Sequence, residues 1–193
     1  MLVGLLLGLA GWPGAADDKP EFAPIVERKL SFYDFTLKTP DGGDFNLRSH
    51  AADKQLTIIG FAAGWCKNSN NNAHVVKRLY DKYHERGLGV VVVMEYSTPE
   101  EVRVHLNRVG IVYPVVIETD SRASRKKSRH YEYRRKVEDK RKWGTPFYVI
   151  LDRKDIGPER PDGLLASRVY TVSGEIIEAE AEAFIEQKLT ANK

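Results

Sequence analysis

The sequence of 193 residues contains a single cysteine, Cys66, so an intramolecular disulfide is excluded. Exported proteins commonly pair their cysteines as disulfides. A lone thiol in an oxidising compartment is open to oxidation unless it is buried or used. The sequence context of Cys66 therefore has to explain why the residue is there.

A membrane-spanning run is also lacking at the N-terminus, where the apolar stretch from Leu2 to Trp12 falls short of the about 20 residues that cross a bilayer. Residues 1–16 carry no charged side chain and include small residues before Asp17, which is typical of a signal peptide. We therefore expect export to the periplasm or the extracellular space, with no transmembrane segment after cleavage. An uncleaved anchor and a buried apolar strand are the alternative interpretations.

The five histidines lack the spacing of a metal site. Cys66 and His74, eight residues apart on one predicted helix, would lie about 12 Å apart along its axis. Protein ligands bind a zinc ion at about 2.0 to 2.3 Å, so these two side chains cannot share one. We expect neither a metal nor an organic cofactor.

The composition, 42% hydrophobic and 30% charged, is that of a soluble globular domain. We expect an irregular lead-in over residues 17–29 and one domain over 30–190. Alternating residues around the Pro40–Gly43 turn predict a β-hairpin. The remaining predicted strands are 55–63, 88–97, 113–119 and 145–152, with a second hairpin at 166–177; the predicted helices are 68–86, 97–110, 121–142 and 178–189. Alternating strands and helices indicate a three-layer α/β/α fold with a mixed central sheet.

Two motifs stand out in this pattern. Trp65-Cys66 joins an apolar strand to a helix, and Gly144-Thr145-Pro146 introduces a later apolar strand. With the hairpin "YDFTLKTPDGGDFNL", these motifs resemble the thioredoxin fold, in particular the exported TlpA/ResA-like thiol-disulfide oxidoreductases, which border on the AhpC/TSA group. The resemblance covers residues 30–189. It implies a cis peptide bond before Pro146, opposite the cysteine, that turns the Thr145 backbone toward a bound substrate.

The motif departs from the family pattern in three places. Ser69 stands where the family has its second cysteine, and Asn72 and His74 replace an acidic residue and a proline. Ala63 stands where a peroxiredoxin has threonine, which argues against a peroxidase site. Because a serine cannot attack a mixed disulfide, one molecule alone cannot carry out net dithiol reduction.

Cys66 at a helix start is nevertheless in a position that favours its reactive thiolate, because helix N-termini stabilise negative charge and Lys67 adds a positive one. We therefore predict monothiol thiol–disulfide exchange on protein or small-molecule thiols. Cys66 would be the nucleophile, with Trp65, Lys67 and Ser69 around it and Thr145-Pro146 docking substrate. The alternative is a redox-inactive binding module in which Cys66 is a small buried residue, Ser69 an ordinary helix residue and Trp65 a packing aromatic.

Asp120 to Trp143 is strongly basic, with eleven Lys and Arg against four Asp and Glu, while the rest of the chain carries a net charge of −4. One interpretation is a docking surface for an acidic partner, for anionic membrane lipids or for cell-wall polymer; nucleic acid is disfavoured in an exported protein. The other is a solvated helix whose inner face is Tyr133 and Val137. His130 is the histidine of this segment that could approach Cys66.

Overall fold

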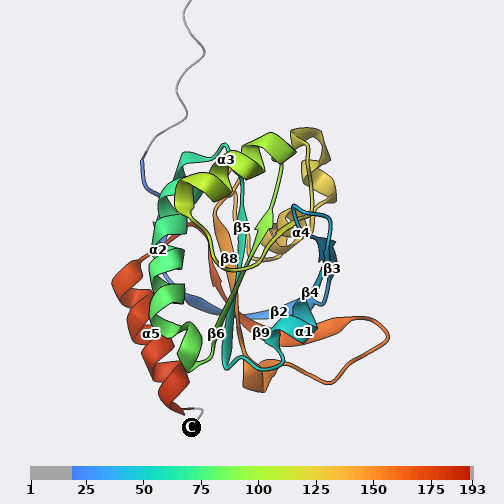
Figure 1. Cartoon of the computed structure of the whole chain (residues 1–193). Coiled ribbons are helices and arrows are strands. Elements are labelled where there is room, and N and C mark those ends of the chain that lie inside the picture. Colours follow the sequence, from blue (N-terminus) through green and yellow to red (C-terminus); the bar gives the residue numbers. More distant parts are fainter. Residues whose placement is uncertain (1–18, 192–193) are drawn as a thin grey trace, which may run out of the picture.

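The computed structural model describes residues 19–191, which form five α-helices and ten strands, eight of the strands in one main sheet (Figure 1). The strands are β1 (Phe22–Ala23), β2 (Val26–Tyr33), β3 (Thr36–Lys38), β4 (Asp44–Asn46), β5 (Leu56–Ala62), β6 (Leu88–Met94), β7 (Val115–Ile117), β8 (Phe147–Asp152), β9 (Leu164–Val172) and β10 (Glu175–Ile176). The helices are α1 (Leu47–Ala51), α2 (Lys67–Tyr83), α3 (Pro99–Val109), α4 (Arg129–Lys136) and α5 (Glu178–Ala191), with 3-10 turns η1 (His84–Arg86), η2 (Arg122–Lys127) and η3 (Arg153–Asp155).

The main sheet has eight strands in the order β2-β9-β8-β5-β6-β7-β3-β4. β5, β6 and β7 run parallel to one another, whereas β8, β9 and β2 pair antiparallel on the β5 side. The β3–β4 hairpin adds to the other edge through one pairing of Lys38 with Ile117. The predicted mixed sheet and its extra N-terminal hairpin are confirmed.

Successive residues of the central strands point to opposite faces of the sheet, and this alternation builds two cores. On one face, Ile58 and Val90 pack with α2, α3 and α5. On the other face, Ile59 and Val91 pack with Leu47 of α1 and Tyr133 of α4. Figure 1 shows α2 and α5 on one side of the sheet and α4 on the other. The three-layer prediction is therefore confirmed.

Helix α3 begins and ends as its sequence predicts. Thr98 and Glu101 form a capping box around Pro99, and Gly110 ends the helix with a left-handed φ of 63°. These local bonds satisfy backbone groups that the helix itself leaves unpaired. These local signals therefore set where the helix begins and ends.

The predicted irregular lead-in is wrong over residues 22–29. Residues 22–23 form β1, and β2 starts at Val26 as the edge strand beside β9. Glu27, Arg28 and Lys29 are exposed there. Three consecutive charged side chains removed the apolar alternation by which a strand is recognised in a sequence.

The second predicted hairpin is also wrong. β9 already has β2 on one side and β8 on the other, so it has no free edge for the segment that follows. β10 instead pairs in parallel with β1, through Phe22 with Glu175 and Ala23 with Ile176.

The basic segment is only partly helical. η2 and α4 cover residues 122–127 and 129–136, after which Glu138 takes a positive φ of 61°. As predicted, Tyr133 is buried, but so is the neighbouring Arg134. A solvated helix over 121–142 is therefore the wrong description of this segment.

Among residues 19–191, no helix is both long and apolar enough to cross a bilayer. The predicted signal peptide, residues 1–16, lies outside the described part of the chain.

Candidate functional site

Cys66 is the N-cap of α2, with an extended backbone at φ −81° and ψ 120°. Its N–H donates to the carbonyl of Ala63 (3.0 Å), and its own carbonyl accepts from the N–H of Asn70 (3.0 Å). The residue is half-buried and its thiol is free. Gly64 allows the loop to lie against α3, because a Cβ there would be 2.5 Å from the Glu101 carbonyl oxygen. The end of β5 and the packing of α3 thus fix where the thiol stands.

The second motif lies against this thiol. The Thr145–Pro146 peptide bond is cis, and both residues are buried. The Cys66 thiol donates a hydrogen bond to the Thr145 carbonyl oxygen, with Sγ and O 3.3 Å apart. The structure therefore brings together the two segments that the sequence singled out.

The other predicted site residues lie around Cys66 in different ways. Lys67 is exposed at the first position of α2. Ser69 is buried, and its hydroxyl accepts from the backbone N–H of Ala63 at 3.3 Å. Within the described residues, Ser69 makes no hydrogen bond to the sulfur. It supports the loop that leads to Cys66, and it cannot supply a second thiol.

Trp65, the residue before Cys66, contacts an aromatic ring and a cationic side chain. Its indole N–H donates to the Tyr96 carbonyl at 3.0 Å, and its ring meets Trp143 edge-on with centroids 5.2 Å apart. The Arg122 guanidinium lies 4.8 Å above the Trp65 ring. Cation–π contacts of this kind hold an aromatic side chain in place without burying it completely.

Two asparagines in the first turns of α2, Asn70 and Asn72, are buried. Asn70 donates to the carbonyls of Gly64 and Cys66, both at 2.9 Å, and its side-chain oxygen faces His105 Nδ1 at 2.8 Å. Burial lowers the pKa of His105 to about 4, so its ring is neutral with the proton on Nδ1. Asn70 therefore ties the cysteine loop to α3.

Asn72, in place of the family's acidic residue, is also buried. Its side-chain oxygen accepts from the Ile176 N–H (2.9 Å) and the Tyr148 hydroxyl (2.7 Å), and its amide donates to the Ile176 carbonyl (3.1 Å). This set of bonds joins α2 to β8 and β10. Asn72 therefore has a structural role in this chain.

His130 lies behind the proline loop, fully buried and stacked on Phe61 with centroids 5.5 Å apart. Its Nε2 is 3.2 Å from the Gly144 carbonyl and its Nδ1 is 2.9 Å from the Tyr96 hydroxyl. Burial, together with the charge of Arg134, lowers the pKa of His130 to about 3. The ring is neutral, so Nε2–H donates to Gly144 and Nδ1 accepts from Tyr96. His130 thus holds the residue before Thr145.

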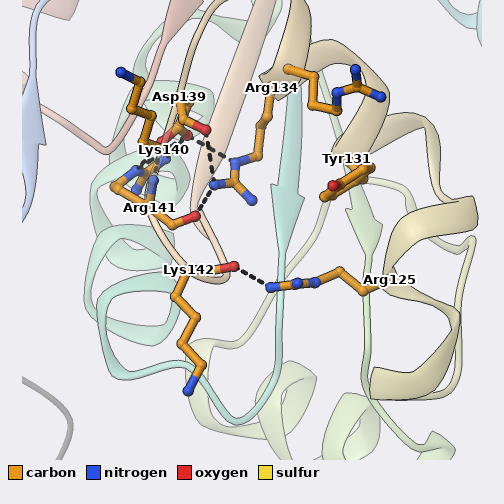
Figure 2. Close-up of a pocket in the computed structure, with 8 residues that line it drawn as sticks. Arg125, Tyr131, Arg134, Asp139, Lys140, Arg141 and Lys142 are labelled. Carbon is orange, nitrogen blue, oxygen red and sulfur yellow. Dashed lines mark hydrogen bonds and ion pairs between the residues drawn. The ribbon is translucent and has the colours of Figure 1, made fainter.

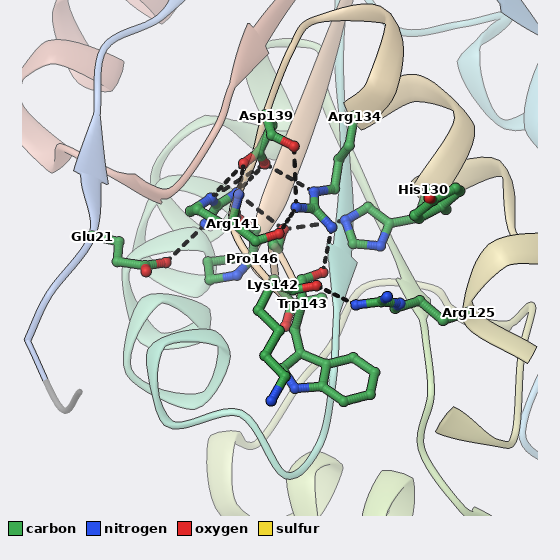
Figure 3. Close-up of polar contacts among 12 residues, drawn as sticks. Glu21, Arg125, His130, Arg134, Asp139, Arg141, Lys142, Trp143 and Pro146 are labelled. Carbon is green, nitrogen blue, oxygen red and sulfur yellow. Dashed lines mark hydrogen bonds and ion pairs between the residues drawn. The ribbon is translucent and has the colours of Figure 1, made fainter. Parts of the chain in front are cut away.

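Two arginines around Asp139 support the same loop (Figure 3). Arg134 Nε donates to Asp139 at 2.9 Å and its Nη1 to the Trp143 carbonyl at 2.7 Å. Arg141 Nη2 donates to Asp139 at 2.7 Å, and to the carbonyls of Gly144 and Pro146 at 3.0 and 3.1 Å. Although burial alone would raise it, these hydrogen bonds keep the pKa of Asp139 below its ordinary value.

Gly144 fits this arrangement because it has no side chain. Its φ is +67°, and a Cβ there would lie 1.9 Å from atoms of the Arg134 guanidinium. The arginine therefore occupies the space a side chain would need. These supporting roles were not predictable from the sequence, because Arg134, Asp139 and Arg141 belong to a charged run that is typical of a solvated surface.

The geometry supports nucleophilic chemistry at one sulfur. A half-buried thiol at a helix N-terminus faces a backbone carbonyl on a braced loop, with an aromatic pair beside it. The buried serine at the fourth position of the motif leaves the chain without an internal thiol to finish an exchange.

Comparison with known proteins agrees with this geometry. The profile of the Redoxin family matches residues 27–156. No curated protein sequence matches the chain.

Solved structures supply further similarities. A thiol:disulfide interchange protein of the thioredoxin family from Chlorobium tepidum is 18% identical, with a TM-score of 0.60 over 84% of this chain and 97% of the other. A putative thiol:disulfide interchange protein DsbE from the same organism is 19% identical, with a TM-score of 0.55 over 90% and 98%. A secreted Mycobacterium tuberculosis disulfide oxidoreductase homologous to E. coli DsbE is 13% identical, with a TM-score of 0.53 over 81% and 95%. At these identities the similarity shows a shared thioredoxin fold.

Proposed function

This chain belongs to the Redoxin family of thioredoxin-fold proteins, and on that basis we propose that it performs thiol–disulfide exchange with one cysteine, Cys66. The observation that carries the proposal is the contact of the Cys66 thiol with the Thr145 carbonyl, at 3.3 Å. A residue kept only for packing would be fully buried, whereas Cys66 is half-buried and its sulfur faces a backbone carbonyl. The substrates are thiols and disulfides of proteins or small molecules.

The exchange has two covalent steps, formation of a mixed disulfide at Cys66 and its resolution. The Cys66 thiolate attacks one sulfur of a substrate disulfide, a Cys66–substrate disulfide forms, and the other substrate sulfur leaves as a thiolate. No net oxidation occurs, since one disulfide is exchanged for another. A second thiolate must then attack the mixed disulfide to free Cys66, and Ser69 cannot provide it. The cycle is therefore completed by a thiol from another molecule.

The surrounding residues would dock the substrate and position Cys66. Thr145 and Pro146 would dock the substrate backbone once it displaces the Cys66 hydrogen bond from the Thr145 carbonyl. Lys67 adds positive charge at the start of α2, and Ser69 holds the loop through Ala63. Trp65, the residue before Cys66, would cover the thiol on one side. These roles are positional, and the covalent chemistry is that of Cys66 alone.

We further propose that residues 1–16 direct export and are removed before Asp17. The supporting observations are the uncharged, apolar composition of this stretch and the fold shared with a disulfide oxidoreductase described as secreted. Export places the thiol in a compartment where disulfide substrates form.

The direct test is a thiol-exchange assay on a disulfide-linked fluorescent peptide in the presence of a small thiol. The chain from Asp17 should accelerate exchange, and Cys66→Ser should reduce the rate to that of the small thiol alone. Lys126→Gln, at an exposed position outside the site, is the matched control and should retain the activity. Equal rates for the wild type and Cys66→Ser would instead favour a redox-inactive binding module.

A further inference from the structure

A second feature beside the site is a cavity of about 320 Å³ in the basic segment (Figure 2). Cavities of this size, at the lower end of the about 300 to 1,000 Å³ range, take small molecules. Its charged lining consists of six Lys or Arg residues and one carboxylate, Asp139.

The positive charge of this cavity is largely uncompensated. Arg134 and Arg141 share Asp139, and Arg141 also pairs with Glu21 at 3.0 Å. Arg125 lies over the Trp143 ring at 5.1 Å and donates to a backbone carbonyl.

Three more cationic side chains of the lining are exposed. Arg135, Lys140 and Lys142 have no carboxylate partner anywhere in residues 19–191. Like charges around one cavity repel each other, and a bound anion relieves that repulsion. The cavity therefore has the character of an anion site for more than one carboxylate, and the guanidinium of Arg135 suits the planar geometry of that group.

The lining of the cavity and the carbonyl that faces the Cys66 sulfur belong to neighbouring residues of the chain. Lys142 lines the cavity. Three residues later, the Thr145 carbonyl accepts the hydrogen bond of the Cys66 thiol. Three residues span at most about 10 Å. Trp143, between them, meets Trp65 edge-on, and Arg125 of the cavity covers Trp143. A molecule the length of a short peptide would reach from the cavity to the sulfur.

From this arrangement we infer that the cavity binds the carboxylates of the small thiol that completes the exchange at Cys66. The inference rests on the proposed function, because the missing thiol at Ser69 creates the need for an external one. The bound thiolate attacks the substrate sulfur of the mixed disulfide, forms a new disulfide with it, and releases the Cys66 thiolate. Electrons and atoms balance without any further oxidant or reductant. The ligand class is a low-molecular-mass thiol that bears at least two carboxylates.

The test starts from wild-type protein linked at Cys66 to a short neutral cysteine peptide. Loss of this adduct is followed by mass spectrometry with glutathione, which has two carboxylates, and separately with neutral 2-mercaptoethanol. The double variant Lys140→Gln/Lys142→Gln removes two cavity charges. Lys126→Gln/Lys127→Gln removes the same charge from exposed positions of the same segment that do not line the cavity.

The expected result is a glutathione rate about tenfold lower in the cavity variant and within about twofold of wild type in the control variant. The 2-mercaptoethanol rate should stay within about twofold of wild type in both. An equal loss in both variants would mean general attraction by the segment and overturn the inference. A parallel loss with 2-mercaptoethanol would overturn it too, because it would mean a disturbed loop.

Failure of the proposed function gives a different result. If wild-type protein forms no adduct at Cys66, the exchange itself fails and the resolving role fails with it. The cavity is then tested alone by calorimetric titration with S-methylglutathione, which has no thiol. Saturable binding that Lys140→Gln/Lys142→Gln abolishes supports the anion site, and absence of binding to the wild type overturns it.

Discussion

The Cys66 sulfur and the Thr145 carbonyl oxygen lie 3.3 Å apart, although 79 positions separate the two residues in the sequence. Three separate groups hold the carbonyl side of this contact: neutral His130 through Gly144, Arg134 through Trp143, and Arg141 through Gly144 and Pro146. Asn70 holds the cysteine side. The thiol therefore faces a surface that is fixed before any substrate arrives.

Replacing Ser69 with cysteine should restore the missing step. Ser69 is 2% exposed and close in size to cysteine, so the fold should accept the change. The new thiol would attack a mixed disulfide at Cys66 and release the substrate without an external thiol. Mass spectrometry should show adducts that persist in the wild type and decay unaided in Ser69→Cys. Ser69→Ala is the control, and its adducts should persist as in the wild type.

Arg134→Met should destabilise the protein by about 3 kcal/mol, because it leaves Asp139 buried with one ionic partner fewer and the Trp143 carbonyl unpaired. Arg135→Met, at the next and exposed position, should change the unfolding free energy by no more than about 0.5 kcal/mol. Urea unfolding of both variants measures the difference. Equal stabilities would mean that Arg134 does not brace the loop.

Gly144→Ala and Gly110→Ala separate backbone strain from a steric clash. Both glycines have a positive φ, +67° and +63°, but a Cβ meets the Arg134 guanidinium only at position 144 and nothing within 4 Å at position 110. Both variants lose about 1 kcal/mol from the φ alone. The clash should make Gly144→Ala at least about 2 kcal/mol less stable than Gly110→Ala. Thermal unfolding of the two variants measures this difference, and equal midpoint temperatures would contradict it.

Stability should fall as the pH drops below about 6.5. Burial lowers the pKa of His130 to about 3 and that of His105 to about 4, whereas an unfolded histidine has a pKa of about 6.5. Between these values the unfolded chain binds protons that the folded chain does not, so each histidine removes up to about 1.4 kcal/mol per pH unit. Above about pH 6.5 the full contribution of both neutral histidines to the unfolding free energy is present.

The variant His130→Gln should therefore flatten the dependence of the unfolding free energy on pH between about 4 and 6.5. Adding His105→Gln should flatten it again. Denaturant unfolding at a series of pH values gives the slopes. An unchanged slope in His130→Gln would mean that this histidine is not held neutral by burial.

Much of the fold was predictable because strong local signals coincided with it. The apolar runs at β5, β6 and β8, the capping box of α3 and the turn of the β3–β4 hairpin all form the elements their residues favour. Weak local signals failed where tertiary pairing decided the outcome. β10 pairs with β1 because both edges of β9 are taken, and β2 is a strand despite three exposed charges.

The site followed the same rule. The residues that define the motifs, Cys66 and Thr145-Pro146, were visible as local patterns. The ion pairs and hydrogen bonds that hold the loop before Pro146 were not visible, because Arg134, Asp139 and Arg141 belong to a run whose composition favours solvent exposure. Burial of a charged group depends on partners that a single sequence does not reveal, here backbone carbonyls and one carboxylate.

The central claim is that Cys66 forms a mixed disulfide that the chain cannot resolve alone. In the most direct measurement, the wild-type chain from Asp17 is incubated with a disulfide-linked peptide and quenched with acid. The mass of the intact protein is then measured by mass spectrometry. We predict one peptide adduct, located at Cys66, that persists until a small thiol is added and then disappears. An unmodified Cys66 thiol after incubation, or an adduct that decays with no thiol present, would contradict the account.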